Sequence, residues 1–426
     1  MHTGGGSLRP VTMAVVGAGD RGSTYAKYAL LHPDRAKVVA VAEPNPHRRE
    51  KMVREHGIPE HAAFDDWQAL AERERLADAV IISTQDAMHT GPAVALAERG
   101  YHILLEKPMA PTEEECKRIV RAALSNHIIF AVCHVLRYTT YTRVLKSIVD
   151  SGMIGEVVSL QRLEPVGYWH QAHSFVRGNW RREDQSSFML LAKSCHDIDW
   201  MRYIVGKRCA AVSSFGGRSH FRPEKKPPEA SDRCLDCDYE SKCPYSAKKI
   251  YMVFLRGGTH GWPLSVITDE VSEESVAKAL REGPYGRCVY GCDNDVVDHQ
   301  VVNMEFEGGQ TASFTMTAFT RARAREDRVF GTRGEIQGDG SEVRVHDFLT
   351  DTTVVFRTDD TDSPPLGGHG GGDYHLIDTF VRAVALNDSA LILSGPLETL
   401  ETHLVTFAAE RSRRERCVVE IDISHE

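Results

Sequence analysis

The chain has 426 residues, of which 42% are hydrophobic and 26% are charged. This is the composition of a globular protein, and the length predicts two domains because single cores seldom grow beyond about 250–300 residues. A formal net charge of −9 argues against a nucleic-acid partner, since such proteins present a basic surface. No apolar run reaches the roughly 18 residues of a membrane span, so no membrane partner is expected.

The cysteines and the N-terminal residues bear on the compartment. The first residues contain no apolar stretch of the kind that a secretory signal peptide needs. Ten cysteines in a chain of this length are too few for a disulfide scaffold. We therefore expect a cytoplasmic protein whose thiols are reduced.

The first third of the chain alternates strand-like and helix-like patterns. Apolar runs predict strands at 11–16, 37–43, 79–83, 102–106 and 128–134, with helical patterns between them. Such alternation is typical of a parallel sheet with helices on both faces. We expect residues 1–136 to form a Rossmann dinucleotide-binding domain of the α/β class.

A glycine-rich segment, Gly-Ala-Gly-Asp-Arg-Gly at 17–22, follows the first predicted strand and opens a predicted helix. In that context G-x-G-x-x-G is the dinucleotide fingerprint: its glycines allow a tight turn, a close approach to the pyrophosphate and close helix packing. The helix N-terminus then offers N–H groups to the phosphates. The cofactor-binding candidates in this segment are Gly17, Gly19, Asp20, Arg21 and Gly22.

Glu43 indicates which dinucleotide is bound. It ends the second predicted strand, about twenty residues after the last glycine, where a carboxylate accepts the ribose hydroxyls of NAD. Arg48 and Arg49 could instead hold the extra phosphate of NADP, but we predict NAD. Ligands of such sheets lie beyond the carboxyl ends of the strands, so further cofactor candidates are Thr84, His89, Glu106 and Lys107.

The pattern changes after residue 136. Runs rich in Val, Thr and Phe predict strands at 155–164, 298–307, 310–318, 328–332, 342–346 and 352–357. We expect residues 137–426 to form a C-terminal α+β domain with a mostly antiparallel open sheet, through which the chain forms a homo-oligomer. Residues 218–292 interrupt this domain as a polar insertion without an obvious core.

Five of the ten cysteines lie in the insertion. A Cys-x₂-Cys pair in a cytoplasmic chain indicates a metal rather than a disulfide, and zinc favours four thiolates in a tetrahedron. We expect a structural zinc ion on Cys234, Cys237, Cys243 and Cys288, with Cys292 as the alternative fourth ligand. The same spacing is also compatible with an iron–sulfur cluster or with unligated thiols.

Four segments together resemble the Gfo/Idh/MocA oxidoreductases: the glycine motif, Glu-Lys-Pro at 106–108, His-Val-Leu-Arg-Tyr at 134–138 and Cys-His-Asp-Ile-Asp at 195–199. The likeness covers nearly the whole chain except the insertion. It implies hydride transfer to a bound nicotinamide, with His196 as the catalytic base and Lys107 as the active-site lysine that positions a hydroxyl. Histidine suits proton transfer near neutral pH.

One position departs from the family pattern. The family usually places an aspartate four residues before this histidine, and here that position is Ala192. Its neighbour Lys193 would share a helix face with His196. A second ammonium near Lys107 would make the pocket cationic, lower the pKa of His196 and favour an anionic substrate or an enolate-like intermediate. The alternative is that Lys193 points to solvent.

Aromatic and donor-rich residues follow in the second part of the chain. Such side chains suit sugars, and arginine can hold a carboxylate or sulfonate at two points. A solvated loop or a subunit contact is the alternative for the stretch 168–177. The substrate-binding candidates are Arg137, Tyr138, Tyr168, His170, His173, Arg177 and His299.

These features predict an NAD-dependent oxidoreductase acting on a hydroxyl of a sugar, sugar acid or cyclitol. The first alternative is an NAD-dependent glycosidase that works by transient ring oxidation, elimination, water addition and re-reduction, on an anionic sugar such as a sulfoquinovoside. The change to Ala192 and Lys193 favours this alternative. The second is a non-catalytic NAD-bound sensor, against which the presence of both Lys107 and His196 argues.

Overall fold

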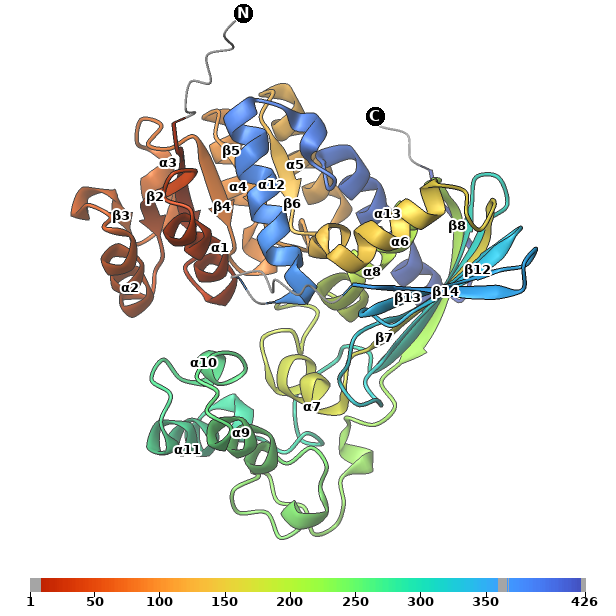
Figure 1. The fold of residues 1–426 in the computed structure, drawn as a ribbon. Coiled ribbons are helices and arrows are strands. Elements are labelled where there is room, and N and C mark those ends of the chain that lie inside the picture. The colour runs from red at the N-terminus through yellow and green to blue at the C-terminus, as the bar shows by residue number, and fades with distance from the viewer. Residues whose placement is uncertain (1–8, 359–365, 367, 423–426) are drawn as a thin grey trace, which may run out of the picture.

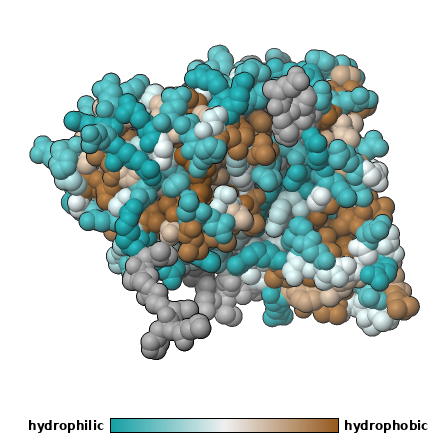
Figure 2. All heavy atoms as spheres, turned by 90° about the horizontal axis from the view of Figure 1, so that it is seen from above, coloured by the Kyte–Doolittle hydropathy of each residue, from teal (hydrophilic) through white to brown (hydrophobic). Residues whose placement is uncertain are grey.

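The computed structural model describes residues 9–358, 366 and 368–422. They form two β-sheets flanked by helices, with a smaller helical lobe, drawn in green, beneath them (Figure 1). The face seen from above mixes hydrophilic and hydrophobic residues, as protein surfaces ordinarily do (Figure 2). Within the described ranges, every helix falls short of the length and apolar character that a membrane crossing requires.

The first sheet is the expected Rossmann sheet. Its six strands are all parallel, in the order β3-β2-β1-β4-β5-β6. The order reverses between β1 and β4, and ligands of such sheets bind at this switch point. The strands are β1 (Val11–Val16), β2 (Ala36–Ala42), β3 (Ala63–Phe64), β4 (Ala79–Ile82), β5 (His102–Leu105) and β6 (Phe130–Val132).

Helices cover both faces of this sheet, which explains why its strands are continuous apolar runs. Among the helices, α5 begins at a side-chain cap, because the Thr112 hydroxyl accepts the N–H of Glu115. The helices are α1 (Asp20–Leu31), α2 (Pro46–His56), α3 (Trp67–Ala71), α4 (Thr90–Glu98) and α5 (Glu113–Ser125).

The second sheet is mixed and mostly antiparallel, as expected, in the order β14-β13-β12-β11-β7-β10-β9-β8-β15, with β7 and β10 parallel. The sequence analysis missed β8, whose small residues pattern weakly and which takes its register from pairing with β9. The strands are β7 (Val157–Pro165), β8 (Cys209–Gly217), β9 (His299–Phe306), β10 (Thr311–Thr317), β11 (Glu326–Gly331), β12 (Gly334–Gly338), β13 (Glu342–Asp347), β14 (Thr352–Arg357) and β15 (Val419–Glu420).

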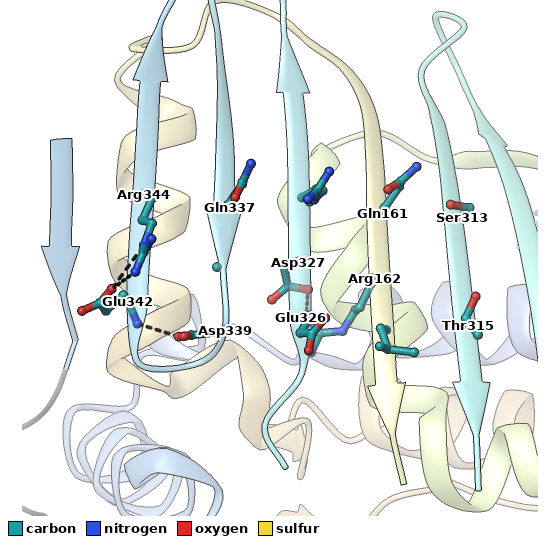
Figure 3. A pocket seen from close by; sticks show the side chains of 13 residues that line it. Gln161, Arg162, Ser313, Thr315, Glu326, Asp327, Gln337, Asp339, Glu342 and Arg344 are labelled. Atoms are coloured by element: carbon teal, nitrogen blue, oxygen red, sulfur yellow. Dashed lines mark hydrogen bonds and ion pairs between the residues drawn. The ribbon is translucent and has the colours of Figure 1, made fainter. Parts of the chain in front are cut away.

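Helices cover one face of the second sheet. They are α6 (Thr140–Asp150), α8 (Met189–Val205) and α13 (Pro396–Glu415), and buried residues alternate with more exposed ones along β9 and β10 (Figure 1). On the other face, Gln161, Ser313, Thr315 and Gln337 stand over a shallow cavity of about 590 Å³ (Figure 3).

The insertion has a core, so the expectation that it lacks one is wrong. Phe221, Ile250, Tyr251, Leu264 and Leu280 are buried together in it. The helices of the insertion are α9 (Ala247–Arg256), α10 (Leu264–Ile267) and α11 (Glu273–Glu282). Each is short and has one apolar face, which the polar composition of the whole segment does not reveal. The core also contains side chains from the segment formed by α7 (Tyr168–His170) and the π-helix Gln171–Arg177.

The C-terminal helices return to the first sheet. Helix α12 (Gly372–Leu386) places Leu376, Ile377 and Phe380 in the same buried core as β1 and β4. Along α13, Leu404 belongs to that core, whereas Val405 belongs to the core of the second sheet. The boundary expected at residue 136 therefore separates the strands of the two sheets. The core of the first sheet, however, also contains residues from beyond that boundary.

Candidate active site

The glycine-rich loop after β1 has the geometry of a dinucleotide cradle. Gly17 has a φ of +89°, and a side chain there would meet the carbonyl oxygen of Ser83 at 2.6 Å. A side chain at Gly22 would lie 2.0 Å from the Gly17 carbonyl oxygen, so α1 could not pack this closely. At Gly19 the nearest atom would be 3.9 Å away, on Arg48. The backbone at Gly19 is therefore open to a ligand.

Glu43 follows β2 and contacts this loop. Its Oε2 accepts the N–H of Ala18 at 2.7 Å, and its Oε1 accepts the N–H of Asn45 at 2.9 Å. A carboxylate offers about four lone-pair positions, so both oxygens can accept further hydroxyl donors. Thr84 adds a buried hydroxyl that has no hydrogen-bond partner among the described residues. This donor and acceptor set fits a dinucleotide.

Arg21 and Glu106 form an internal bridge. Arg21 Nε donates to Glu106 Oε1 at 2.7 Å, and its Nη2 donates at 2.5 Å to Asp373 in the first turn of α12. Burial raises the pKa of Glu106, but Arg21 and Lys107 outweigh it and lower the pKa overall. Arg21 and Glu106, both predicted to bind the cofactor, thus connect the glycine loop to α12. Asp20, another predicted cofactor residue, is exposed at the start of α1.

Lys107 connects the two halves of the chain. It lies beyond the carboxyl end of β5, and its Nζ donates to the carbonyl oxygen of Ala192 on α8 at 2.6 Å. The adjoining loop is held by His89, whose Nδ1 lies 2.8 Å from the Pro108 carbonyl oxygen and whose Nε2 lies 3.3 Å from that of Thr84. The ammonium of Lys107 is therefore aimed at the helix that carries the predicted histidine.

Lys193 and His196 lie one turn apart on α8, as their spacing predicts. Lys193 does not point to solvent, because its Nζ lies 3.3 Å from Oε1 of Glu164 near the end of β7. Burial lowers the pKa of Lys193, Glu164 raises it in part, and Arg325 lowers it further. The structure thus brings Lys107, Lys193 and His196 together around one helix.

Arg325 is bound to His196, a contact that the sequence analysis missed. Its Nη2 lies 2.7 Å from Nε2 of His196 and 2.9 Å from a carboxylate oxygen of Glu164. Its Nε also donates to Asp197 at 2.5 Å. A guanidinium only donates hydrogen bonds, so Nε2 accepts and the neutral imidazole carries its proton on Nδ1. Nδ1 is buried and has no partner in the described part of the chain.

The pKa of His196 lies well below its usual value, mainly because the ring is buried and then because of Arg325, Lys107 and Lys193. The lowered pKa of His196 agrees in direction with the effect expected of the two lysines, although Arg325 lowers this pKa more than either lysine does. Glu164 and Asp197 balance two of these cations, so the pocket is less cationic than expected. The only traces of these partners in the sequence are a charged residue near the end of a predicted strand, Glu164, and the arginine-rich segment 321–325, and neither says which residue it contacts.

Of the seven substrate candidates, His170 is near enough to this cluster for the charges of its lysines to act on the ring, which itself packs against Trp262 at 5.0 Å. Burial lowers its pKa well below the usual value, and Lys193 and Lys107 lower it further. Arg137 and Tyr138 are instead used internally. Arg137 forms a buried two-point ion pair with Asp199, at 2.6 Å for both contacts, and the Tyr138 hydroxyl pairs with Ser394 at 3.0 Å.

Three other candidates contact the insertion. His173 Nδ1 lies 2.8 Å from the Tyr251 hydroxyl, the ring of Tyr168 packs edge-on against Tyr245, and Arg177 is buried among backbone carbonyls. His299 is 46% exposed and hydrogen-bonds Asp298 at 2.8 Å. The structure therefore places these four outside the cluster around His196.

The expected metal ligands lie apart from the candidate active site. Cys234, Cys237, Cys243 and Cys288 line one small cavity, and Cys292 is not part of its lining. No group of three or more His, Cys, Asp or Glu side chains among the described residues is already arranged to hold a metal ion. The zinc ion stays a prediction.

Residues 11–134 match the oxidoreductase family with an NAD-binding Rossmann fold, GFO_IDH_MocA, and residues 146–421 match its C-terminal alpha/beta domain. The putative oxidoreductase YteT of Bacillus subtilis is 23% identical over 75% of each chain. The 2,7-anhydro-N-acetylneuraminate hydratase of Escherichia coli is 26% identical over 50% of this chain and 55% of the relative. A solved structure of levoglucosan dehydrogenase with NADH shares the fold, with a TM-score of 0.71 and 20% identity over 97% of this chain and 100% of that one.

Proposed function

This chain belongs to the Gfo/Idh/MocA oxidoreductases, and on that premise we propose that it is an NAD-dependent enzyme that oxidises a hydroxyl of a sugar, sugar acid or cyclitol. The observation that carries the proposal is the contact of Lys107 with the helix of Lys193 and His196, because Lys107 follows β5 at the same carboxyl-terminal edge of the parallel sheet as the glycine loop after β1. A relative of the same fold is a levoglucosan dehydrogenase.

The loop at Gly19 and the N-terminus of α1 would hold the diphosphate of NAD, and Glu43 would accept its ribose hydroxyls. NAD supplies the acceptor for the substrate hydride. The carboxylate of Glu43 would repel the additional phosphate of NADP, so we propose a preference for NAD.

Lys107 and His196 divide the work on the substrate hydroxyl. Lys107 would turn its ammonium from the Ala192 carbonyl to the substrate oxygen and stabilise negative charge there. The neutral ring of His196 would accept the hydroxyl proton at Nε2, after the guanidinium of Arg325 leaves that atom. Lys193, held by Glu164, keeps a second ammonium beside the ring.

A second candidate is an NAD-dependent glycosidase that oxidises and re-reduces its substrate within one turnover. The observation that favours it is the replacement of the family aspartate by Ala192 beside Lys193. Several cations around a neutral base suit an enolate next to a transient ring ketone, because they stabilise negative charge on its oxygen. The hydratase among the relatives acts on an anhydro sugar, by its name.

One experiment separates the two candidates. The enzyme is given a glycoside with a chromogenic aglycone and a trace of NAD, and then free sugars with excess NAD, while aglycone and NADH are followed. Stoichiometric NADH from a free sugar supports the dehydrogenase, whereas many turnovers of aglycone without net NADH support the glycosidase. His196→Asn should lower either rate by about a hundredfold or more. A protein that binds NAD and turns over neither class would be the sensor.

Three further expectations belong to the proposal. We propose that copies of the chain associate through the outer face of the second sheet, which carries side chains such as Gln161 and Ser313 (Figure 3). Sedimentation equilibrium of wild type and Ser313→Arg would test this, since a dimer through that face should weaken in the variant.

A cytoplasmic location without nucleic-acid or membrane partners, and a zinc ion in the insertion, are likewise proposed.

A further inference from the structure

We propose that Cys234, Cys237, Cys243 and Cys288 bind one zinc ion as thiolates, and that this ion anchors the segment 168–177 through Arg177. The site belongs to the insertion and not to the reaction centre. Its test measures metal content and not turnover, so its outcome can be distinguished from that of the proposed activity.

The fold brings these cysteines together from separate segments. An isolated β-bridge pairs Arg233 with Arg287, so Cys234 and Cys288 lie side by side. The N–H of Cys234 donates to the Gly286 carbonyl at 2.9 Å, and the N–H of Cys288 donates to the Asp232 carbonyl at 2.8 Å. Backbone bonds therefore hold this pair in register.

All four cysteines line one enclosed space of about 10 Å³. That is close to the volume that a single water-sized sphere needs. Cys292 is not part of the lining, and its thiol donates to the Cys288 carbonyl at 3.2 Å instead. The space therefore has room for one ion, and its lining selects Cys288 as the fourth ligand.

Two of the sulfurs accept hydrogen bonds from outside the cysteine set. Cys237 Sγ accepts the N–H of Ser231 at 3.4 Å, and Cys234 Sγ accepts Nη2 of Arg177 at 3.4 Å. Donors of this kind stabilise a thiolate over a thiol. They are also the outer hydrogen bonds that metal-ligating groups usually have.

The other two sulfurs have the same kind of partner. The Cys243 sulfur has a backbone hydrogen bond from Tyr245. The Cys288 sulfur has a backbone hydrogen bond from Tyr290. Each of the four sulfurs thus has one donor beside it.

Arg177 supplies an independent argument from charge. It is 1% exposed, and its other bonds go to the backbone carbonyls of Arg287 and Tyr245, both at 2.8 Å. Among the described residues it has no carboxylate within ion-pair distance, and its Nη1 has no partner. A buried cation needs a counter-charge. Four thiolates around a divalent ion leave two negative charges, whereas four neutral thiols leave none.

The donor set and the volume indicate the metal. Four sulfurs favour zinc or an iron–sulfur cluster, and a space for one sphere favours the single ion. Since the side chains are not yet in coordinating positions, the sulfurs would close to about 2.3 Å from the ion. Four thiols lose four protons on binding, which pass to solvent.

The site has a consequence for the substrate pocket. Arg177 ends the segment that contains His170, and the charge of Lys193 acts on the buried ring of His170. An ion that holds Arg177 through Cys234 would therefore also hold the segment that carries His170 toward the candidate active site. Loss of the ion should loosen that segment.

The test uses the full-length chain, purified in metal-free buffer and analysed by inductively coupled plasma mass spectrometry. We expect about one zinc per chain, lost in Cys237→Ser and Cys288→Ser and kept in the matched control Cys292→Ser. Hydrogen exchange across 168–177 should be faster in the two variants that lose zinc.

Because a ligand variant can fail to fold, the wild type gives a second readout. Cobalt(II) added after removal of zinc by a chelator should produce the intense visible bands of a tetrahedral four-thiolate site. Folded wild type that carries no zinc and gives no such cobalt spectrum overturns the proposal. Iron–sulfur absorbance also overturns it, as does loss of zinc in Cys292→Ser but not in Cys288→Ser.

Discussion

Nη2 of Arg325 lies 2.7 Å from Nε2 of His196, on the nitrogen that a general base would use. Asp197 and Glu164 hold the guanidinium there through short ion pairs. The imidazole is thereby kept neutral, but its lone pair is occupied. Proton transfer at this atom therefore requires a shift of Arg325, which makes Arg325 a positioning residue for the base.

Replacing Arg325 with methionine should change the pH dependence of catalysis. The guanidinium lowers the pKa of His196, so its removal should raise that pKa. A base must be unprotonated to act, so the acidic limb of the kcat/KM profile should move to higher pH. Arg323→Met, whose side chain is half-exposed beside Glu326, is the matched control and should leave the profile in place. An unshifted profile in Arg325→Met would separate Arg325 from the base.

Lys193 should matter through its charge. Lys193→Met removes the ammonium that pairs with Glu164 beside His196, and we expect kcat/KM to fall by about a hundredfold. Lys193→Arg keeps a cation on the same face and should recover part of the loss. Steady-state kinetics with the best substrate measures both. Equal activity of wild type and Lys193→Met would show that the Glu164–Lys193 pair is only structural.

Glu43 should set the preference between NAD and NADP. Glu43→Gln keeps the size of the side chain but removes the charge that repels the phosphate of NADP, so the ratio of the two dissociation constants should approach one. Fluorescence titration or calorimetry measures both constants. Tighter binding of NADP than of NAD by the wild type would contradict this role of Glu43 and would indicate that Arg48 or Arg49 holds the additional phosphate.

The first sheet and the glycine loop were predictable because their determinants are local. Buried parallel strands are apolar runs, and a tight turn that only glycine tolerates is written in consecutive residues, as at Gly17. That Lys193 and His196 share one face of a helix follows from their spacing of three residues alone. The strands, the loop and this shared face therefore depend only on residues that are close in sequence.

The partners of that histidine were not predictable in the same way. Arg325 is 129 positions from His196 in sequence, and it reaches the ring because β11 pairs with β7 in one register. Glu164 contacts Lys193 because α8 packs against β7. Arg137 and Arg177 illustrate the converse, since their donor-rich sequence suited a ligand and the fold uses them inside the protein.

Stability should fall as the pH falls below about 6.5, because several histidines are buried in their neutral form. Burial lowers the pKa of His134 to about 3, of His173 to about 3 and of His403 to about 4. Between pH 6.5 and 4 the unfolded chain binds protons that the folded chain does not bind. The free energy of unfolding therefore rises with pH across this window and levels off above it.

His134 is the residue to change, because it is 0% exposed and neither ring nitrogen has a hydrogen-bond partner among the described residues. His134→Leu should remove about 1.4 kcal/mol of destabilisation per pH unit below 6.5, which is the contribution of one proton. Urea unfolding of wild type, His134→Leu and the exposed control His61→Gln at pH 7.5, 6 and 5 measures the slopes. A slope that is the same in His134→Leu and wild type would mean that His134 accepts a proton in the folded protein.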